Sequence, residues 1–227
     1  MTTQNLQRKT LKQRFAELQA EREISWAPEQ LAKNAGQRAT LVERFDPAAV
    51  AQTGDVLPDA TLVDQDGVAH KLSTLTANGP AVLVFFRFGG CPACNIALPY
   101  YDETLAAPLK AAGIGLLAVS AQNPVDRSII DRHGLSFPVT ADPDYALARA
   151  LGITFFPDEQ PEVAPGQPWI GATLGTQSYE IDQPAVLIVQ PDLSLRRLWV
   201  SPDWLDRTDA ADILAELGLN ASQAQAA

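Results

Sequence analysis

The chain has 227 residues, enough for one large domain or for one domain with an extension. Its 17 basic and 27 acidic residues give a formal net charge of -10, so neither a nucleic acid nor an anionic membrane is expected as its main partner. An apolar fraction of 46% is ordinary for a globular protein with a packed core, which excludes intrinsic disorder of the whole chain. The longest apolar run, from Ala81 to Phe86, is far shorter than a membrane-spanning helix requires.

The first residues are predicted to form an N-terminal helical extension, residues 1–50. Residues 4–23 carry a stripe with spacings near three and four, typical of an amphipathic helix: Leu6, Leu11, Phe15, Leu18 and Arg22. A second helix is expected from Pro28, a favourable first-turn proline, towards Gly36, which would stop it. The stripe must be covered by the main domain or by a second copy of the chain, so a homodimer is one hypothesis.

Residues 51–218 are predicted to form one α/β domain, and residues 219–227 a disordered tail. Apolar runs and turn signals predict a hairpin over 61–72 and strands over 81–86, 115–120, 137–140, 185–189 and 195–200. Helices are expected over 95–112, 124–133, 144–151 and 209–217, with Asn123 and Thr208 as caps of the second and fourth. The proline-rich loop 157–183 is long enough to be functional or mobile. This order predicts a mixed-sheet α/β sandwich.

The only two cysteines, Cys91 and Cys94, lie in one Cys-Pro-Ala-Cys segment after the strand 81–86. The first residues contain no apolar run typical of a secretory signal, so we expect a cytoplasmic protein. There, a close cysteine pair is more often catalytic or metal-binding than a structural disulfide. A zinc site would need four ligands, and His70 and His133 are isolated from each other and from any second cysteine pair. We therefore expect thiol chemistry, with no metal ion and no cofactor.

The position of the pair indicates a role for each sulfur. A thiol reacts as its thiolate, and the amino end of a helix lowers the pKa of a thiol placed there. Cys91 occupies that end, and Pro92 suits the first helical position. We therefore assign Cys91 as the attacking thiol and Cys94, one turn further on, as the resolving thiol. Arg87 either stabilises a thiolate or pairs with an acid at the surface, and His133 is expected to be solvated at the end of its helix.

The segment 84–95 resembles the strand, turn and helix of peroxiredoxin-like members of the alkyl hydroperoxide reductase/thiol-specific antioxidant (AhpC/TSA) family, whose usual form is Arg-Gly-x-Trp-Cys-Pro-Tyr-Cys-Asn. The likeness continues at 119–122, 133–143, 184–189 and 199–203, and it covers roughly residues 50–217. It implies a thioredoxin-like fold with a central mixed β-sheet flanked by helices. In that fold Pro184 matches the cis-proline that faces the cysteines. Gly90 and Ala93 replace the usual Trp and Tyr, which makes the lip of the site smaller.

By this resemblance, the chain is expected to reduce hydroperoxides through a Cys91/Cys94 dithiol–disulfide cycle, with a thioredoxin-type protein as reductant. The supporting residues are expected to be Arg87, Gly90, Pro92 and Pro184. Phe88 and Val84 stand where authentic peroxiredoxins have a threonine or serine and a proline. Two alternatives therefore stay open. One is exchange with protein disulfides without significant peroxidase activity, and the other is a non-catalytic redox sensor or adaptor.

Overall fold

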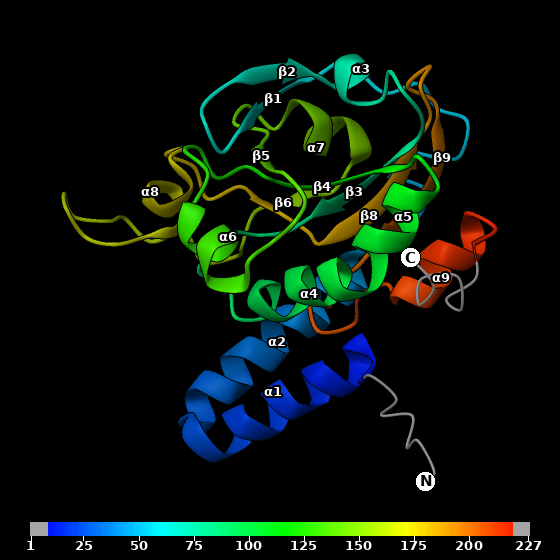
Figure 1. The fold of residues 1–227 in the computed structure, drawn as a ribbon. Coiled ribbons are helices and arrows are strands. Elements are labelled where there is room, and N and C mark those ends of the chain that lie inside the picture. The colour runs from blue at the N-terminus through cyan, green and yellow to red at the C-terminus, as the bar shows by residue number, and fades with distance from the viewer. Residues whose placement is uncertain (1–8, 220–227) are drawn as a thin grey trace, which may run out of the picture.

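The computed structural model describes residues 9–219, which contain a seven-stranded mixed sheet with helices on both faces (Figure 1). The strands lie in the order β2-β1-β5-β4-β3-β8-β9. Their bounds are Thr61–Asp64 (β1), Ala69–Lys71 (β2), Ala81–Phe85 (β3), Gly115–Ser120 (β4), Val139–Ala141 (β5), Ala185–Val189 (β8) and Leu195–Val200 (β9). A separate small sheet pairs β6 (Thr154–Phe155) with β7 (Ile181–Asp182). The expected α/β architecture with a central mixed sheet is confirmed.

The helices cover the sheet and extend beyond it at one side. Their bounds are Leu11–Ser25 (α1), Pro28–Arg44 (α2), Leu72–Leu75 (α3), Cys94–Tyr101 (α4), Ala107–Ala111 (α5), Arg127–His133 (α6), Ala146–Leu151 (α7), Ile170–Leu174 (α8) and Ala210–Glu216 (α9). A π-helical segment, Asp102–Ala106, joins α4 to α5. Figure 1 shows α1 and α2 below α4, on the side of α4 away from the sheet.

Strand β3 lies at the centre of the sheet, between the parallel strand β4 and the antiparallel strand β8. All five of its residues are buried, because both faces of the sheet are covered. Val82 and Val84 belong to the core on one face, while Leu83 and Phe85 belong to the core on the other. The strand is therefore held from both sides, and the segment with the two cysteines follows it directly.

Helix α1 packs on the domain through its apolar stripe. A capping box at Thr10 begins the helix. Leu11 and Phe15 are buried in the core that contains α4, and Leu18 packs against that core. The same chain therefore covers the stripe, whose first expected member, Leu6, lies outside the described residues.

Helix α2 runs past Gly36 to Arg44, so the expected stop at Gly36 is wrong. Gly36 does not adopt the left-handed backbone that ends a helix, and an interior glycine costs only about 1 kcal/mol. Exposed ion pairs join α2 to the segment after β6, between Lys33 and Glu159 and between Arg44 and Asp158.

Local details at three helix ends differ from the sequence expectations. Asp126 caps α6, so this helix begins after Asn123, and Asp209 rather than Thr208 caps α9. Aspartate is a better cap than threonine, which accounts for Asp209, whereas asparagine and aspartate are equally good caps, so the ranking does not decide between Asn123 and Asp126. Leu219 packs against the core after α9, and the predicted disordered tail therefore does not include it. Residues 220–227 lie outside the described residues.

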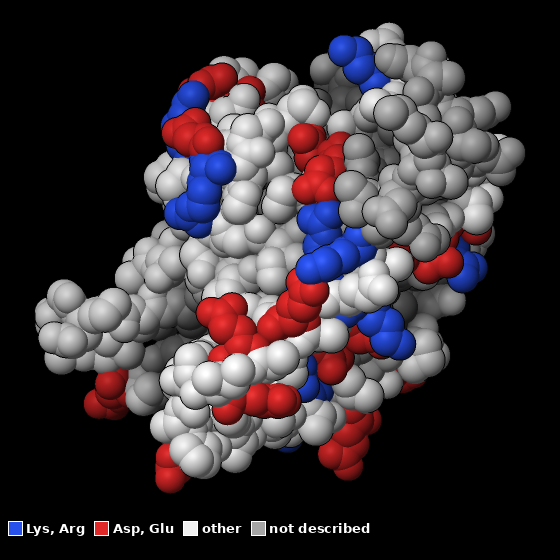
Figure 2. Space-filling view, turned by 60° about the horizontal axis from the view of Figure 1, so that its bottom comes forward, with Lys and Arg blue, Asp and Glu red and all other residues white. Residues whose placement is uncertain are grey.

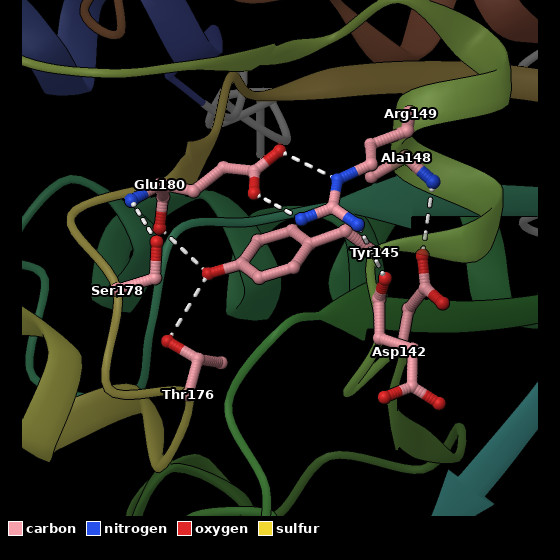
Figure 3. A network of polar contacts seen from close by, with 8 residues as sticks. Asp142, Tyr145, Ala148, Arg149, Thr176, Ser178 and Glu180 are labelled. Carbon is pink, nitrogen blue, oxygen red and sulfur yellow. Dashed lines mark hydrogen bonds and ion pairs between the residues drawn. The ribbon is translucent and has the colours of Figure 1, made fainter.

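The loop 157–183 contains α8 and β7, and its second half is tied to α7 (Figure 3). The Tyr145 hydroxyl donates to the main-chain oxygen of Glu180 at 2.6 Å and lies 3.4 Å from the hydroxyl oxygen of Thr176. The Arg149 guanidinium donates to the Glu180 carboxylate at 2.9 Å. These bonds fix the end of the loop, and with it the start of β8 at Pro184.

Charged side chains of both signs are mixed on the surface that includes the N-terminal helices. Figure 2 turns the lower side of Figure 1 towards the viewer and shows Lys and Arg interspersed with Asp and Glu. Within residues 9–219, no helix combines the length and the apolar character needed to cross a membrane.

Candidate active site

Cys91 lies in the turn between β3 and α4, and Cys94 is the first residue of α4. The main-chain oxygen of Cys91 accepts hydrogen bonds from the main-chain N–H groups of Cys94 and Asn95, each at 3.0 Å. Helix α4 begins at Cys94, one residue before the expected start at residue 95, and Pro92 lies exposed in the preceding turn and not at the first helical position. Both sulfurs are free thiols in the buried core, and Cys91 is only 4% exposed.

Asn95 holds this turn together. Its side-chain N–H groups donate to the main-chain oxygens of Gly89 at 2.7 Å and Cys91 at 2.9 Å. Its side-chain oxygen accepts hydrogen bonds from Arg132 at 2.6 Å and from His133 at 2.9 Å. His133 is therefore not the solvated residue expected from the sequence, and burial lowers its pKa. The contact with α6 fixes the turn against a second helix.

Gly89 and Gly90, the two glycines before Cys91, differ in the space that surrounds them. The N–H of Gly89 donates to the side chain of Gln122 at 2.8 Å, and a Cβ at Gly89 would collide with the carboxylate of Asp126. Gly90 is exposed, and a Cβ there would lie 3.3 Å from the ring of Phe88. The close approach of α6 therefore requires a glycine at Gly89, whereas Gly90 leaves the rim of the site small.

The surroundings of the two thiols shift their pKa values in opposite directions. A hydrogen bond to Cys94 and burial raise the pKa of Cys91 well above its ordinary value. Burial acts against ionisation of Cys94 too, but the hydrogen bond from Cys91, the charge of Arg207 and a main-chain hydrogen bond from Arg87 hold its pKa well below the ordinary value. The expected lowering of the Cys91 pKa is therefore wrong, because the hydrogen bond to Cys94 and burial raise it.

Arg207 and Arg87 supply the positive charge beside the pair. The Nη2 of Arg207 lies 3.4 Å from the Cys94 sulfur, and its Nε donates to the main-chain oxygen of Trp204 at 2.9 Å. The Arg87 guanidinium stacks over the Trp204 ring at 4.5 Å and interacts electrostatically with both cysteines. Among the described residues it forms no ion pair with an acid, so its location agrees with the thiolate-stabilising interpretation.

Pro184 immediately precedes β8, and its main-chain oxygen accepts a hydrogen bond from the main-chain N–H of Ser201 at 2.8 Å. The peptide bond before it is not cis, as the resemblance implied, since the one cis peptide bond within residues 9–219 joins Asn123 to Pro124. Pro184 and Arg207 line the same narrow gap between β8 and the segment before α9. Pro184 therefore lies next to the arginine that contacts Cys94.

Sequence reasoning missed Arg207 and the contribution of Arg22. Arg207 follows the last strand in a segment without a motif, and only the folded chain brings it to the cysteines. Arg22 did carry a signal, because it continues the apolar stripe of α1, where a charged residue is unexpected. It is buried, and it interacts electrostatically with Cys91.

A buried pair of thiols between the central strand and the following helix of a mixed sheet defines a dithiol protein of the thioredoxin-like class. The family model "Redoxin" matches residues 52–165, and the chain belongs to this family. The resemblance to peroxiredoxin-like proteins is thereby confirmed.

Curated relatives cover part of the chain. Thiol-disulfide oxidoreductase ResA of Halalkalibacterium halodurans is 32% identical over 117 residues, which span 50% of this chain and 64% of that protein. Peroxiredoxin bcp1 of Schizosaccharomyces pombe is 28% identical over 105 residues, which span 44% of this chain and 52% of that protein. The chain thus covers less than two thirds of the length of either relative.

Solved structures confirm the thioredoxin-like fold. Reduced Prx3 from Vibrio vulnificus, solved in complex with hydrogen peroxide, has 25% sequence identity and a TM-score of 0.58, over 74% of this chain and 99% of that one. Peroxidoxin BcpB from Mycobacterium tuberculosis has 19% identity and a TM-score of 0.55, over 74% of this chain and 96% of that one, and shows the fold alone.

Proposed function

We propose that the protein reduces hydroperoxides through a dithiol–disulfide cycle of Cys91 and Cys94. The observation that carries this proposal is the hydrogen-bonded thiol pair with the Arg207 guanidinium 3.4 Å from the Cys94 sulfur. A thiolate stabilised by a cation is the nucleophile that attack on a peroxide oxygen needs. Membership of the redoxin family and similarity to peroxiredoxins support a hydroperoxide as the substrate.

We assign the attack to Cys94, whose pKa is lowered, and this reverses the roles assigned from the sequence. The Cys94 thiolate attacks the terminal peroxide oxygen, so an S–O bond forms and the O–O bond breaks. The leaving oxygen takes a proton and departs as an alcohol or as water, while Cys94 is oxidised by two electrons to a sulfenic acid. The Cys91 thiol then attacks Cys94, forming the disulfide and releasing water. A thioredoxin-type dithiol returns two electrons by exchange.

Exchange with protein disulfides is the second candidate, and the name of the ResA relatives favours it. The burial of both sulfurs favours a small hydroperoxide over a protein as the oxidant, because a folded substrate cannot reach a sulfur that is almost without exposed surface. The site must also open locally when a protein reductant arrives.

For the compartment and the partners we keep the predictions made from the sequence. We propose a cytoplasmic protein that is reduced by a thioredoxin-type protein and that binds neither a nucleic acid nor a membrane. The argument for a homodimer is weaker, because the domain of the same chain covers the apolar stripe of α1. A monomeric mass in light scattering would remove it. A negligible reduction rate with every dithiol donor would favour the redox sensor or adaptor.

The test is the rate at which hydrogen peroxide and cumene hydroperoxide oxidise the pre-reduced protein, followed by stopped-flow fluorescence. We expect oxidation well above the rate of a free thiol in the wild type and no such reaction in Cys94→Ser. The matched variant Cys91→Ser should still be oxidised at Cys94 and should accumulate a sulfenic acid that dimedone labels.

If the reaction were lost only in Cys91→Ser, the attacking thiol would be Cys91 and not Cys94. Oxidation of the wild type no faster than that of a free thiol would contradict the peroxidase and leave disulfide exchange as the function to pursue.

A further inference from the structure

Three arginine side chains converge on the thiol pair from separate parts of the chain. Arg22 comes from α1, Arg87 follows β3, and Arg207 precedes α9. Arg207 contacts the sulfur of Cys94, Arg87 interacts with both cysteines, and Arg22 interacts with Cys91. The ion pairs between arginine and carboxylate within residues 9–219 all involve other arginines.

Burial makes this concentration of positive charge costly. Arg22 is 5% exposed and Arg207 is 8% exposed. Buried charges are paired as a rule, because an unpaired one loses its hydration without compensation. The anionic groups that act on the three guanidinium groups are the thiol pair and the exposed carboxylate of Glu21, the chain neighbour of Arg22. The site therefore has excess positive charge in a chain whose net charge is -10.

Each of the three guanidinium groups has one buried nitrogen without a hydrogen-bond partner. Nη1 of Arg22, Nε of Arg87 and Nη1 of Arg207 are buried without a partner. Aromatic rings cover the faces instead: Arg22 lies over Trp26 at 4.6 Å and Arg87 over Trp204 at 4.5 Å. A cation over a ring keeps its edge donors available. Such donors beside apolar rings suit an organic anion with a hydrocarbon body, and the fork of a guanidinium matches a carboxylate.

We propose that Arg22, Arg87 and Arg207 recognise a carboxylate on the oxidising substrate, so that the preferred substrate is an organic hydroperoxide that carries a carboxylate group. This inference rests on the proposed function, because it names the substrate class of the same dithiol. The covalent step is unchanged: the O–O bond breaks, the S–O bond forms on Cys94, and a carboxylate-bearing alcohol leaves. The N-terminal extension then completes the site through Arg22.

The test compares cumene hydroperoxide with its para-carboxylated analogue at constant ionic strength. We expect the analogue to oxidise pre-reduced wild-type protein at least about tenfold faster, since a hydrogen bond to a charged group contributes that much or more. Arg22→Gln should bring the ratio of the two rates towards one, and Arg22→Lys should keep part of the preference. Lys12→Gln removes an exposed charge from the same helix and should keep the wild-type ratio.

If the wild type reacted with the carboxylated analogue and with cumene hydroperoxide at nearly equal rates, this result alone would overturn the inference. An equal loss of preference in Lys12→Gln and Arg22→Gln would also overturn it, because the effect would then be one of overall charge.

A second measurement separates this inference from the proposed function. Para-carboxycumyl alcohol, the product of the analogue, cannot oxidise a thiol, so its protection of the cysteines from iodoacetamide reports binding alone. Protection by this alcohol and not by neutral cumyl alcohol supports the carboxylate site even if neither hydroperoxide is reduced. Rapid reduction of both hydroperoxides at equal rates, without protection, rejects the carboxylate site and keeps the peroxidase.

Discussion

At the scale of single residues, Arg207 is one of the groups that lower the pKa of Cys94, after the hydrogen bond from Cys91. Replacing it by methionine in a Cys91→Ser background removes the guanidinium that lowers the pKa of Cys94, while the burial that raises this pKa remains. The pH midpoint for alkylation of Cys94 by iodoacetamide should therefore rise by about one unit or more.

Arg127→Met is the matched control, since it removes an exposed arginine that pairs with Asp66 away from the site. It should leave the midpoint in place. An unchanged midpoint in Arg207→Met would show that Arg207 does not stabilise the thiolate.

The sequence is enough to identify both sulfurs but not which of them is ionised. Cys91 and Cys94 are recognisable because they follow a buried strand at a short spacing. Arg207, whose charge lowers the pKa of Cys94, lies 113 positions after it, and no local pattern connects the two. The pKa of each thiol is therefore a tertiary property.

At the scale of the elements, α1 is bound to the domain by a few buried side chains. Phe15 is 2% exposed and lies against Arg207, whereas Ile24 of the same helix is 89% exposed. Phe15→Ala should lower the free energy of unfolding by about 3–5 kcal/mol, because it leaves a cavity in the core. The same change should speed alkylation of Cys91 by exposing the site.

Ile24→Ala is the control on the same helix, and it should change the stability by no more than about 0.5 kcal/mol. Urea unfolding and the rate of reaction with iodoacetamide measure both effects. Equal behaviour of the two variants would mean that α1 does not cover the site.

The strands were predictable where burial on both faces produces a continuous apolar run, as in β3, β4 and β8. Helix ends were less predictable, because residues of equal capping strength, such as Asn123 and Asp126, lie close together in the sequence. The order of strands in the sheet and the packing of α1 against α4 depend on long-range contacts, which periodicity does not contain.

At the scale of the whole molecule, one buried acid couples stability to pH. Asp182 in β7 accepts a hydrogen bond from the Ala121 N–H at 3.0 Å. Burial, and then the charge of Asp142, raises the pKa of Asp182 well above 3.8. The folded state thus holds this proton more tightly than the unfolded state. Its contribution to stability is complete below pH 3.8 and is lost as the pH rises, by up to about 1.4 kcal/mol per unit.

Asp182→Asn cannot ionise, so it should become more stable relative to the wild type as the pH rises from 3.8 to neutrality. Urea unfolding of both proteins across this range measures the difference. Asp131→Asn, at an exposed aspartate, should run parallel to the wild type. A constant difference for Asp182→Asn would mean that Asp182 is ionised to the same extent in the folded and unfolded states.

The arginines around the dithiol also bear on its electron-transfer equilibrium. In the reduced site the thiolate offsets part of the positive charge, but a disulfide carries no charge, so oxidation leaves the guanidinium groups to repel one another. A thermodynamic cycle links stability to redox equilibrium. The free energy by which repulsion destabilises the oxidised fold therefore appears as an equivalent increase in the reduction potential. The disulfide form is therefore the more strained of the two, and even a weakly reducing dithiol can drive the protein back to its resting state.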